Sequence, residues 1–343
     1  MNKHSKYTIK LILFACLLLI FICINLSYGS INIPLKSILQ TLIGNDVTKE
    51  SWQYIILQYR LPKAITAVLV GSGLSICGLL MQTLFRNPLA GPFVLGISSG
   101  ASLGVALLVL GISIFSGSVA GIAFSNLGIA FAASLGAFFV LSAVMLVAKK
   151  VKNTMSILII GLMFGSFTAA IISVLAYFSS AENLQQYVFW TFGSLGNLGW
   201  DEIFILCIIY LFSILILLTI IKPLNSLLLG ENYAVSLGVN LKKTRNIILL
   251  VTGLLTGVIT AFSGPIAFIG LAVPHLTKLL IKTSDHKILL PSVAIAGAII
   301  MLISDTIAQL PNSEYSLPIN AVTSLFGAPI VIWLLVRKRK ISY

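Results

Sequence analysis

Long apolar runs alternate with short polar connections along almost the whole chain. A helix needs about 20 predominantly apolar residues to cross the hydrocarbon core of a bilayer. Runs of roughly that length fall at 10–28, 61–82, 93–111, 124–147, 154–178, 203–221, 246–262, 266–281, 288–306 and 319–336. The pattern therefore predicts ten membrane-spanning helices, the eighth of them short and interrupted by Pro274.

The second and third runs are joined by a short turn that contains two prolines, Pro88 and Pro92. Proline cannot continue a helix and biases the preceding residue away from helical backbone, so the sequence predicts a membrane hairpin. Arg60 and Lys63 flank Pro62 where this hairpin begins, after a predicted short interfacial helix over 51–59. We expect both cations on a first helical turn, where the helix dipole disfavours positive charge and where only a partner outside that helix would favour them.

Composition supports a membrane protein and excludes a soluble globular domain. Hydrophobic residues make up 58% of the 343 residues and charged residues only 9%, whereas soluble domains are typically about 25% charged. Mean hydropathy is +1.06. We therefore expect an all-α integral membrane protein whose residues 1–343 form one polytopic domain.

Charge predicts the orientation of the spans, because cytoplasmic loops are enriched in Lys and Arg. With the N-terminus inside, ten crossings place 18 of the 22 cations inside, including the tail Arg337 to Lys340. Only Lys36, Lys49, Arg60 and Lys63 fall outside. This favours both termini in the cytoplasm. The excess of inside cations accounts for the formal charge of +13. This charge favours contact with anionic lipid headgroups. No nucleic-acid-binding motif accompanies it in the sequence.

An alternative exists for the first run, because a Lys-rich start followed by apolar residues 11–24 also fits a secretory signal peptide. We favour a retained first span. The four cysteines and three histidines are scattered without metal-ligand spacing, so neither a metal site nor a cofactor is expected.

The fifth run combines small and hydroxyl residues with apolar ones and carries no charge. It holds Gly161, Gly165 and Ser166, and glycines four apart also occur at Gly100/Gly104, Gly117/Gly121 and Gly253/Gly257. Such residues suit a wall that meets water or substrate, but they equally suit close helix packing or hydrogen bonding to the helix's own backbone. No ionisable residue lies in the middle of a span, and Asp305 lies near the end of one, which weakens ion-coupled transport.

The connection 222–245 is the longest predicted cytoplasmic segment with structure of its own. Ala234 and Leu237, three residues apart, predict a short amphipathic helix ended by Gly238, with a second, basic helix from about Leu241. An apolar face outside the membrane suggests a docking surface. The alternative is a helix lying on the inner leaflet, which Lys242, Lys243 and Arg245 would favour.

Several motifs, spread over nearly the whole chain, resemble one family. They are Arg-Leu-Pro-Lys at 60–63, Gln82 with Asn87 to Ala90, Leu95 to Ala101, Leu237-Gly238-Val239, Gly264 to Leu271 with Pro274-His275, Asp285-His286-Lys287 and Leu325 to Pro329. Together they resemble the permease subunits of ABC importers for iron-siderophores, haem and cobalamin. The sequence departs from that pattern with Lys63 and Lys278 in place of Arg, Gln309 in place of a cation and Asn320 in place of Gly.

The resemblance implies a type II importer permease of ten helices per subunit in the cytoplasmic membrane, paired with a second copy or with a paralogous permease. It also implies two ATPase subunits and an extracytoplasmic binding protein as partners. The ATPase must be a separate chain, because no Gly-x-x-x-x-Gly-Lys-Ser/Thr phosphate loop occurs. The residue patterns and the resemblance together predict three groups of site residues. These are Arg60 and Lys63 for binding-protein docking; Gln82, Gly161, Met163, Gly165, Ser166 and Phe167 along the path; and Gly230, Glu231, Ala234, Leu237, Gly238 and Val239 for ATPase coupling.

We expect an iron-siderophore-type chelate as the substrate, with cobalamin or haem as alternatives. Two other classes of protein are alternatives to the importer. An ion-coupled secondary transporter or channel would share the general architecture. An intramembrane enzyme is disfavoured, because no Ser/His/Asp set or metal-ligand pair lies within the spans.

Overall fold

The computed structural model describes residues 3–45, 49–111, 125–151, 154–310, 313 and 315–336. The predicted basic tail from Arg337 to Lys340 and the pair Gly117/Gly121 lie outside the described residues. Within the described part of the chain all regular structure is helical.

Ten helices coincide with the ten predicted runs. They are α1 (Lys3–Ser27), α4 (Leu61–Phe85), α5 (Ile97–Val109), α7 (Asn126–Lys150), α8 (Thr154–Tyr177), α10 (Trp200–Leu218), α13 (Leu241–Ser263), α14 (Ile269–Ile281), α15 (His286–Ala308) and α16 (Ile319–Val336). Seven of these helices are long and apolar enough to cross a bilayer by themselves, whereas α5, α14 and α16 are shorter apolar helices. The predicted all-helical membrane architecture is confirmed.

Shorter helical elements lie between these ten. They are α2 (Leu35–Ile43), α3 (Glu50–Ile55), the π-helical turn η1 (Ile56–Arg60), the 3₁₀ turn η2 (Pro92–Leu95), α9 (Ala181–Thr191), α11 (Ile221–Leu227) and α12 (Glu231–Ser236). The helices α2 and α9 were not predicted. The predicted hairpin turn lies between α4 and α5, where Gly96 takes a left-handed conformation with φ +72° before α5 begins.

The chain divides into two compact units, and α4 and α10 each contribute to both. Of the described residues, unit 1 takes those up to Ile76, Ser194–Ile208 and those from Ala267 to Val336; unit 2 takes those within Cys77–Gly193 and Ile209–Ile266. A single domain over 1–343 stays a prediction.

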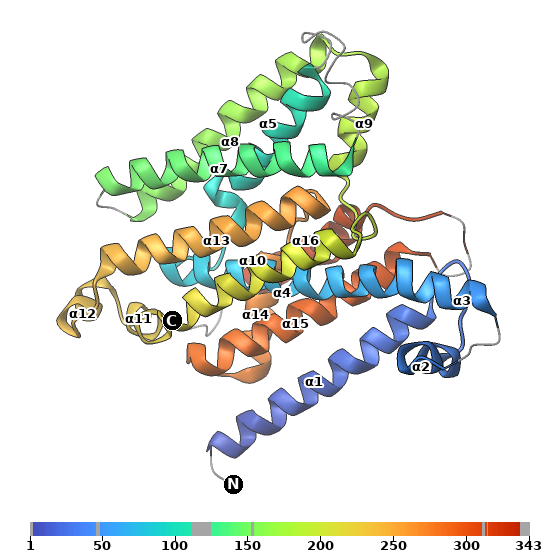
Figure 1. Ribbon diagram of the computed structural model, residues 1–343. Coiled ribbons are helices and arrows are strands. Elements are labelled where there is room, and N and C mark those ends of the chain that lie inside the picture. The colour runs from blue at the N-terminus through green and yellow to red at the C-terminus, as the bar shows by residue number, and fades with distance from the viewer. Residues whose placement is uncertain are drawn as a thin grey trace. The chain divides into compact units, whose positions relative to one another are not determined.

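In unit 1, α1 lies along α15, and α14 and α16 also pack on α15 (Figure 1). Gly71 on α4 meets Gly297 on α15 so closely that a Cβ on either residue would overlap the carbonyl oxygen of the other. Small residues thus allow two helix backbones to approach, as membrane packing favours.

In unit 2, α5 packs against both α7 and α8, and α13 packs against α7 (Figure 1). Gly100 and Gly104 on α5 face Gly136 and Ala132 on α7, where an added Cβ would overlap backbone atoms. Close packing through the pair Gly100/Gly104 is therefore confirmed. Gly253 on α13 similarly makes room for Leu141 of α7.

One expectation was wrong: Arg60 and Lys63 do not lie on a first helical turn. The helix begins at Glu50 and runs without interruption to Phe85, so that the predicted interfacial helix and the second span are one helix. The π-helical turn makes this possible. In its i→i+5 hydrogen-bonding pattern the carbonyl oxygen of Leu57 faces position 62, where Pro62 has no N–H. The indole Nε1 of Trp200 donates to that oxygen instead, at 3.2 Å.

Candidate functional site

A cluster of charged and polar side chains joins α1, α4 and α15 in unit 1. Asp305 on α15 is only 2% exposed and forms an ion pair with Lys63 of α4, the Lys63 Nζ lying 3.0 Å from Asp305 Oδ1. Its other oxygen, Oδ2, accepts hydrogen bonds from Asn25 Nδ2 at 2.9 Å and from Gln309 Nε2 at 2.7 Å. A buried carboxylate is costly unless it is paired and hydrogen-bonded, and these three donors meet that requirement.

Arg60 binds the end of α1 rather than a carboxylate. Its Nη1 donates to the carbonyl oxygens of Leu26 at 2.6 Å and Ser27 at 2.9 Å, and its Nη2 donates to that of Ile31. The last carbonyls of a helix have no partner within the helix and carry partial negative charge, so a guanidinium there is favourable. Arg60 and Lys63 thus both have partners within the chain.

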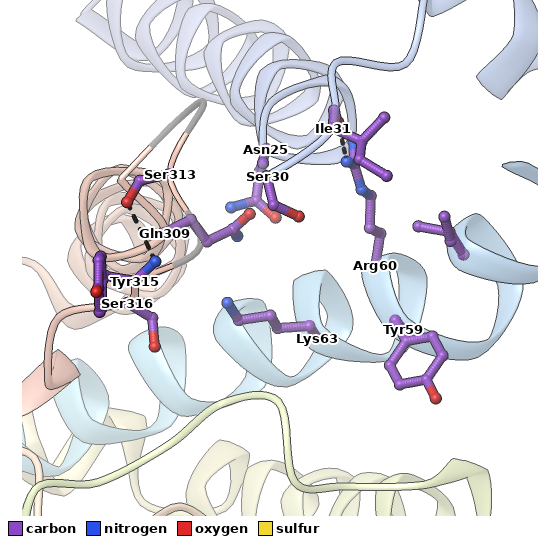
Figure 2. Close-up of a pocket in the computed structure, with 12 residues that line it drawn as sticks. Asn25, Ser30, Ile31, Tyr59, Arg60, Lys63, Gln309, Ser313, Tyr315 and Ser316 are labelled. Atoms are coloured by element: carbon purple, nitrogen blue, oxygen red, sulfur yellow. Dashed lines mark hydrogen bonds between the residues drawn. The ribbon is translucent and has the colours of Figure 1, made fainter.

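A cavity of about 370 Å³ opens beside these two cations. In Figure 2, Arg60 extends toward Ile31 and Lys63 extends toward Gln309, whereas Tyr59 points the other way. Hydroxyl-bearing side chains, including Ser30, Ser313 and Tyr315, complete the lining. Lys63 remains 25% exposed although it is paired. Two cations against one carboxylate leave a net positive charge, which suits an acidic group from outside; the docking role of Arg60 and Lys63 stays a prediction.

The sequence interpretation missed Asn25, Trp200 and the pairing role of Asp305. One signal for Asp305 was present, because it is the acidic residue inside the predicted run 288–306. An isolated carboxylate within a span calls for a nearby cation. Nothing local identified Lys63 as that cation.

The predicted path residues fall into two groups by burial. Met163, Ser166 and Phe167 lie on an exposed face of α8, with Met163 58% and Phe167 64% exposed. This uncharged face, the α8 stripe, follows helical spacing and also includes Met155, Ile159, Leu162, Ser173, Val174 and Tyr177.

The other predicted path residues are less accessible. Gln82 is 1% exposed, Gly161 is buried, and Gly165 lies partly covered near Ser99. Gly161 serves close packing, because a Cβ there would overlap the backbone of Val94 and Leu95 at η2. Contact of these three residues with a transport path stays a prediction.

The segment predicted to couple to an ATPase contains α11 and α12. Gly238 has φ +80°. Its N–H donates to the carbonyl of Val235 at 2.8 Å, and the N–H of Val239 donates to that of Ala234 at 3.0 Å. This is the predicted glycine-terminated helix end, which requires a left-handed residue. A basic helix begins at Leu241, as predicted, but it continues into the span and forms the first turns of the long α13.

Ala234 and Leu237 do not share a face, contrary to expectation. Ala234 is fully buried, because α12 packs on α11 and α13, whereas Leu237 is 56% exposed. The exposed apolar side chains around α12 are Leu229, Tyr233, Val235 and Leu237. Beside α12 a cavity of about 900 Å³ is lined by Glu231 and Tyr233 together with Phe85, Arg86 and Met155. Gly230 also lines this cavity and has φ +112°.

Comparison with known proteins identifies the family. Residues 17–337 match the FecCD transport family. The vitamin B12 import system permease protein BtuC of Salmonella paratyphi A is 37% identical over 290 residues, which cover 84% of this chain and 85% of that protein. BtuC of Citrobacter koseri is 37% identical over 289 residues, covering 84% of each chain.

A solved structure gives the same result at the level of the fold. It is an ABC transporter in an inward-facing conformation, assigned provisionally to the metal-chelate type. The likeness has a TM-score of 0.82 at 31% identity and covers 96% of this chain and 99% of that one. The chain therefore belongs to the FecCD transport family and is a multi-pass permease subunit of an ABC importer.

Proposed function

We propose that this permease carries a large metal chelate of the iron-siderophore type across the cytoplasmic membrane. The α8 stripe is the observation that supports this substrate class. It offers exposed apolar side chains and the hydroxyls of Ser166 and Ser173, and it contains no charged residue. A large, polar-edged chelate needs a smooth passage, because a fixed charge would hold it too tightly for release.

Cobalamin is the second candidate, and the relatives favour it. The vitamin B12 import permeases are 37% identical to this chain, and the metal-chelate transporter structure is 31% identical. The substrate is decided by uptake into proteoliposomes that hold the permease, its ATPase and its binding protein. We expect ATP-dependent uptake of a ferric siderophore at least tenfold above that of cobalamin or haem. The reverse ratio would assign cobalamin or haem. Uptake that needs no ATPase and follows an ion gradient would contradict the importer mechanism.

The partners and topology of the complex are part of the same proposal. An ATPase docks on 227–245 from the cytoplasm, where both termini of this chain also lie, and a binding protein docks over Arg60 and Lys63 on the other side. The exposed apolar residues of α12 support the first contact. The net positive charge of the cavity beside Lys63 supports the second, because it complements acidic side chains.

A second copy of this chain completes the path. The α8 stripe is uncovered in a single subunit although it includes large apolar side chains such as Phe167 and Tyr177. Two copies that place their stripes around one axis would line a shared passage with them.

We predict that cysteines placed singly along α8 will crosslink between two subunits in a helical pattern. Positions 163, 166, 167 and 170 should crosslink, whereas position 168, which is buried against the rest of its own subunit, should not. Crosslinking yields on gels, measured in membranes, give the pattern. Yields without periodicity, or no crosslinks at all, would contradict the stripe's place at the axis.

A further inference from the structure

We propose that the groove between α7 and α13 is a binding site for one anionic phospholipid. The groove forms where α7 ends and α13 begins. It holds an open, shallow cavity of about 420 Å³ lined by Met145, Asn240, Lys242, Lys243, Asn246, Ile247 and Leu250. Cationic and amide groups thus line one part of a single cavity and apolar side chains line another, as an amphiphile requires.

The order of these groups along α13 matches the order of groups in a phospholipid. Lys243, Ile247 and Leu250 follow one another at i, i+4 and i+7, so they share one face of the helix. With a rise of 1.5 Å per residue, Leu250 lies about 10 Å further into the span than Lys243. On α7, Met145 lies four residues before Lys149, so here too the apolar side chain lies further from the helix end than the lysine. Charge therefore sits at the helix ends and apolar surface lies deeper, since α7 and α13 are both membrane spans.

In the part of the chain that the structure describes, Arg245, and neither Lys242 nor Lys243, binds the last carbonyls of α7. Arg245 donates from Nη2 to the carbonyl of Ala148 at 3.0 Å and from Nη1 to that of Val151 at 3.4 Å. It thereby neutralises the negative end of α7, which would otherwise repel an anion. Lys242 and Lys243 are exposed, as are Lys149 and Lys150 at the end of α7. The result is a basic cluster around a groove that opens at the membrane surface.

A neighbouring cavity of about 380 Å³ is lined by a carboxylate, that of Glu231. Lys242 lines both cavities, and Glu231 shares the neighbouring one with Lys149 and Arg245. Three cations and this one carboxylate are the charged residues among its described lining, so the net charge there is positive. Basic pockets between membrane helices favour anionic headgroups. A phosphate ion would leave the apolar part of the groove uncovered. That part includes Ile247 and Leu250, which lie beyond the segment 227–245 proposed for ATPase docking.

The test measures lipid binding to the purified permease alone, so that its outcome does not depend on the proposed substrate or on ATPase docking. Native mass spectrometry after titration with phosphatidylglycerol, and separately with phosphatidylcholine, counts the bound lipids. We expect one phosphatidylglycerol to bind at least tenfold more tightly than phosphatidylcholine. The double variant Lys242→Gln, Lys243→Gln should weaken that binding by about 30-fold, from about 1 kcal/mol for each lysine near a membrane surface.

Two further variants make the result specific. Lys282→Gln with Lys287→Gln also removes two exposed cations from helix ends, and it should leave the binding unchanged. Leu250→Gln should weaken phosphatidylglycerol binding about tenfold while all four lysines remain. Equal phosphatidylglycerol affinity for the wild type and the Lys242/Lys243 variant would overturn the proposal. So would displacement of the lipid by millimolar inorganic phosphate, which would indicate a site for phosphate alone.

Discussion

Replacing Asp305 with alanine is expected to lower the free energy of unfolding of this permease by roughly 3 kcal/mol, near the lower end of the range for breaking a buried ion pair. The lower end applies because Lys63 keeps 25% of its side-chain surface exposed and can be partly hydrated. Lys63 would lose its partner, and the amides of Asn25 and Gln309 would each lose an acceptor. Unfolding by heat or denaturant in detergent micelles measures the loss.

A double variant separates stability from docking. Lys63→Met with Asp305→Leu replaces the ion pair with apolar groups of similar size, a change that is often neutral or stabilising for a buried pair. We expect it to recover most of the stability that Asp305→Ala loses. Its affinity for the binding protein should nevertheless fall about tenfold, the effect of losing one charged contact of about 1.4 kcal/mol. Wild-type affinity in the double variant would mean that Lys63 acts only within its own subunit, and wild-type stability of Asp305→Ala would contradict the structural role of the pair.

The spans were predictable because the bilayer imposes one requirement on every crossing. A helix must supply enough consecutive apolar residues wherever it sits in the fold, so hydropathy alone located α1 and α15 even though their packing against each other was unknown. Local turn chemistry was equally informative at Gly238. A helix that ends with a left-handed residue favours glycine whatever surrounds it.

The partners of the charged residues could not be predicted, because they depend on contacts between distant parts of the chain. Asn25 and Asp305 are 280 residues apart, and nothing near either one in the sequence indicates the other. The continuous helix through Pro62 was missed for the same reason. Proline normally ends a pattern of this kind, and here it is accommodated by a π-helical turn and by the indole of Trp200, 143 residues from the carbonyl it binds.

Replacing Leu237 with aspartate is expected to release the ATPase and abolish most uptake while the permease itself remains folded. Leu237 is 56% exposed, directly after α12 and next to the Gly238 turn, so a polar side chain there disturbs little within this subunit. In the proposed complex the same leucine is buried against the ATPase. Its loss should weaken binding roughly 10- to 150-fold, the effect of forgoing about 1.5–3 kcal/mol of apolar burial. Co-purification of the ATPase and ATP-driven uptake in proteoliposomes report the two effects.

Ser236→Asp is the matched control, because it adds the same charge at the neighbouring exposed position without removing an apolar side chain. It should retain at least half of the wild-type uptake, and Leu237→Met should restore binding that Leu237→Asp loses.

Gly238→Val tests the turn separately. No atom lies within 4 Å of a Cβ added at Gly238, yet its φ of +80° disfavours any β-branched residue. That variant should therefore uncouple hydrolysis from uptake by shifting α12, without a steric clash. If Leu237→Asp and Gly238→Val both kept wild-type ATPase binding and uptake, the segment would lie on the inner leaflet, and the ATPase would have to dock elsewhere on the chain.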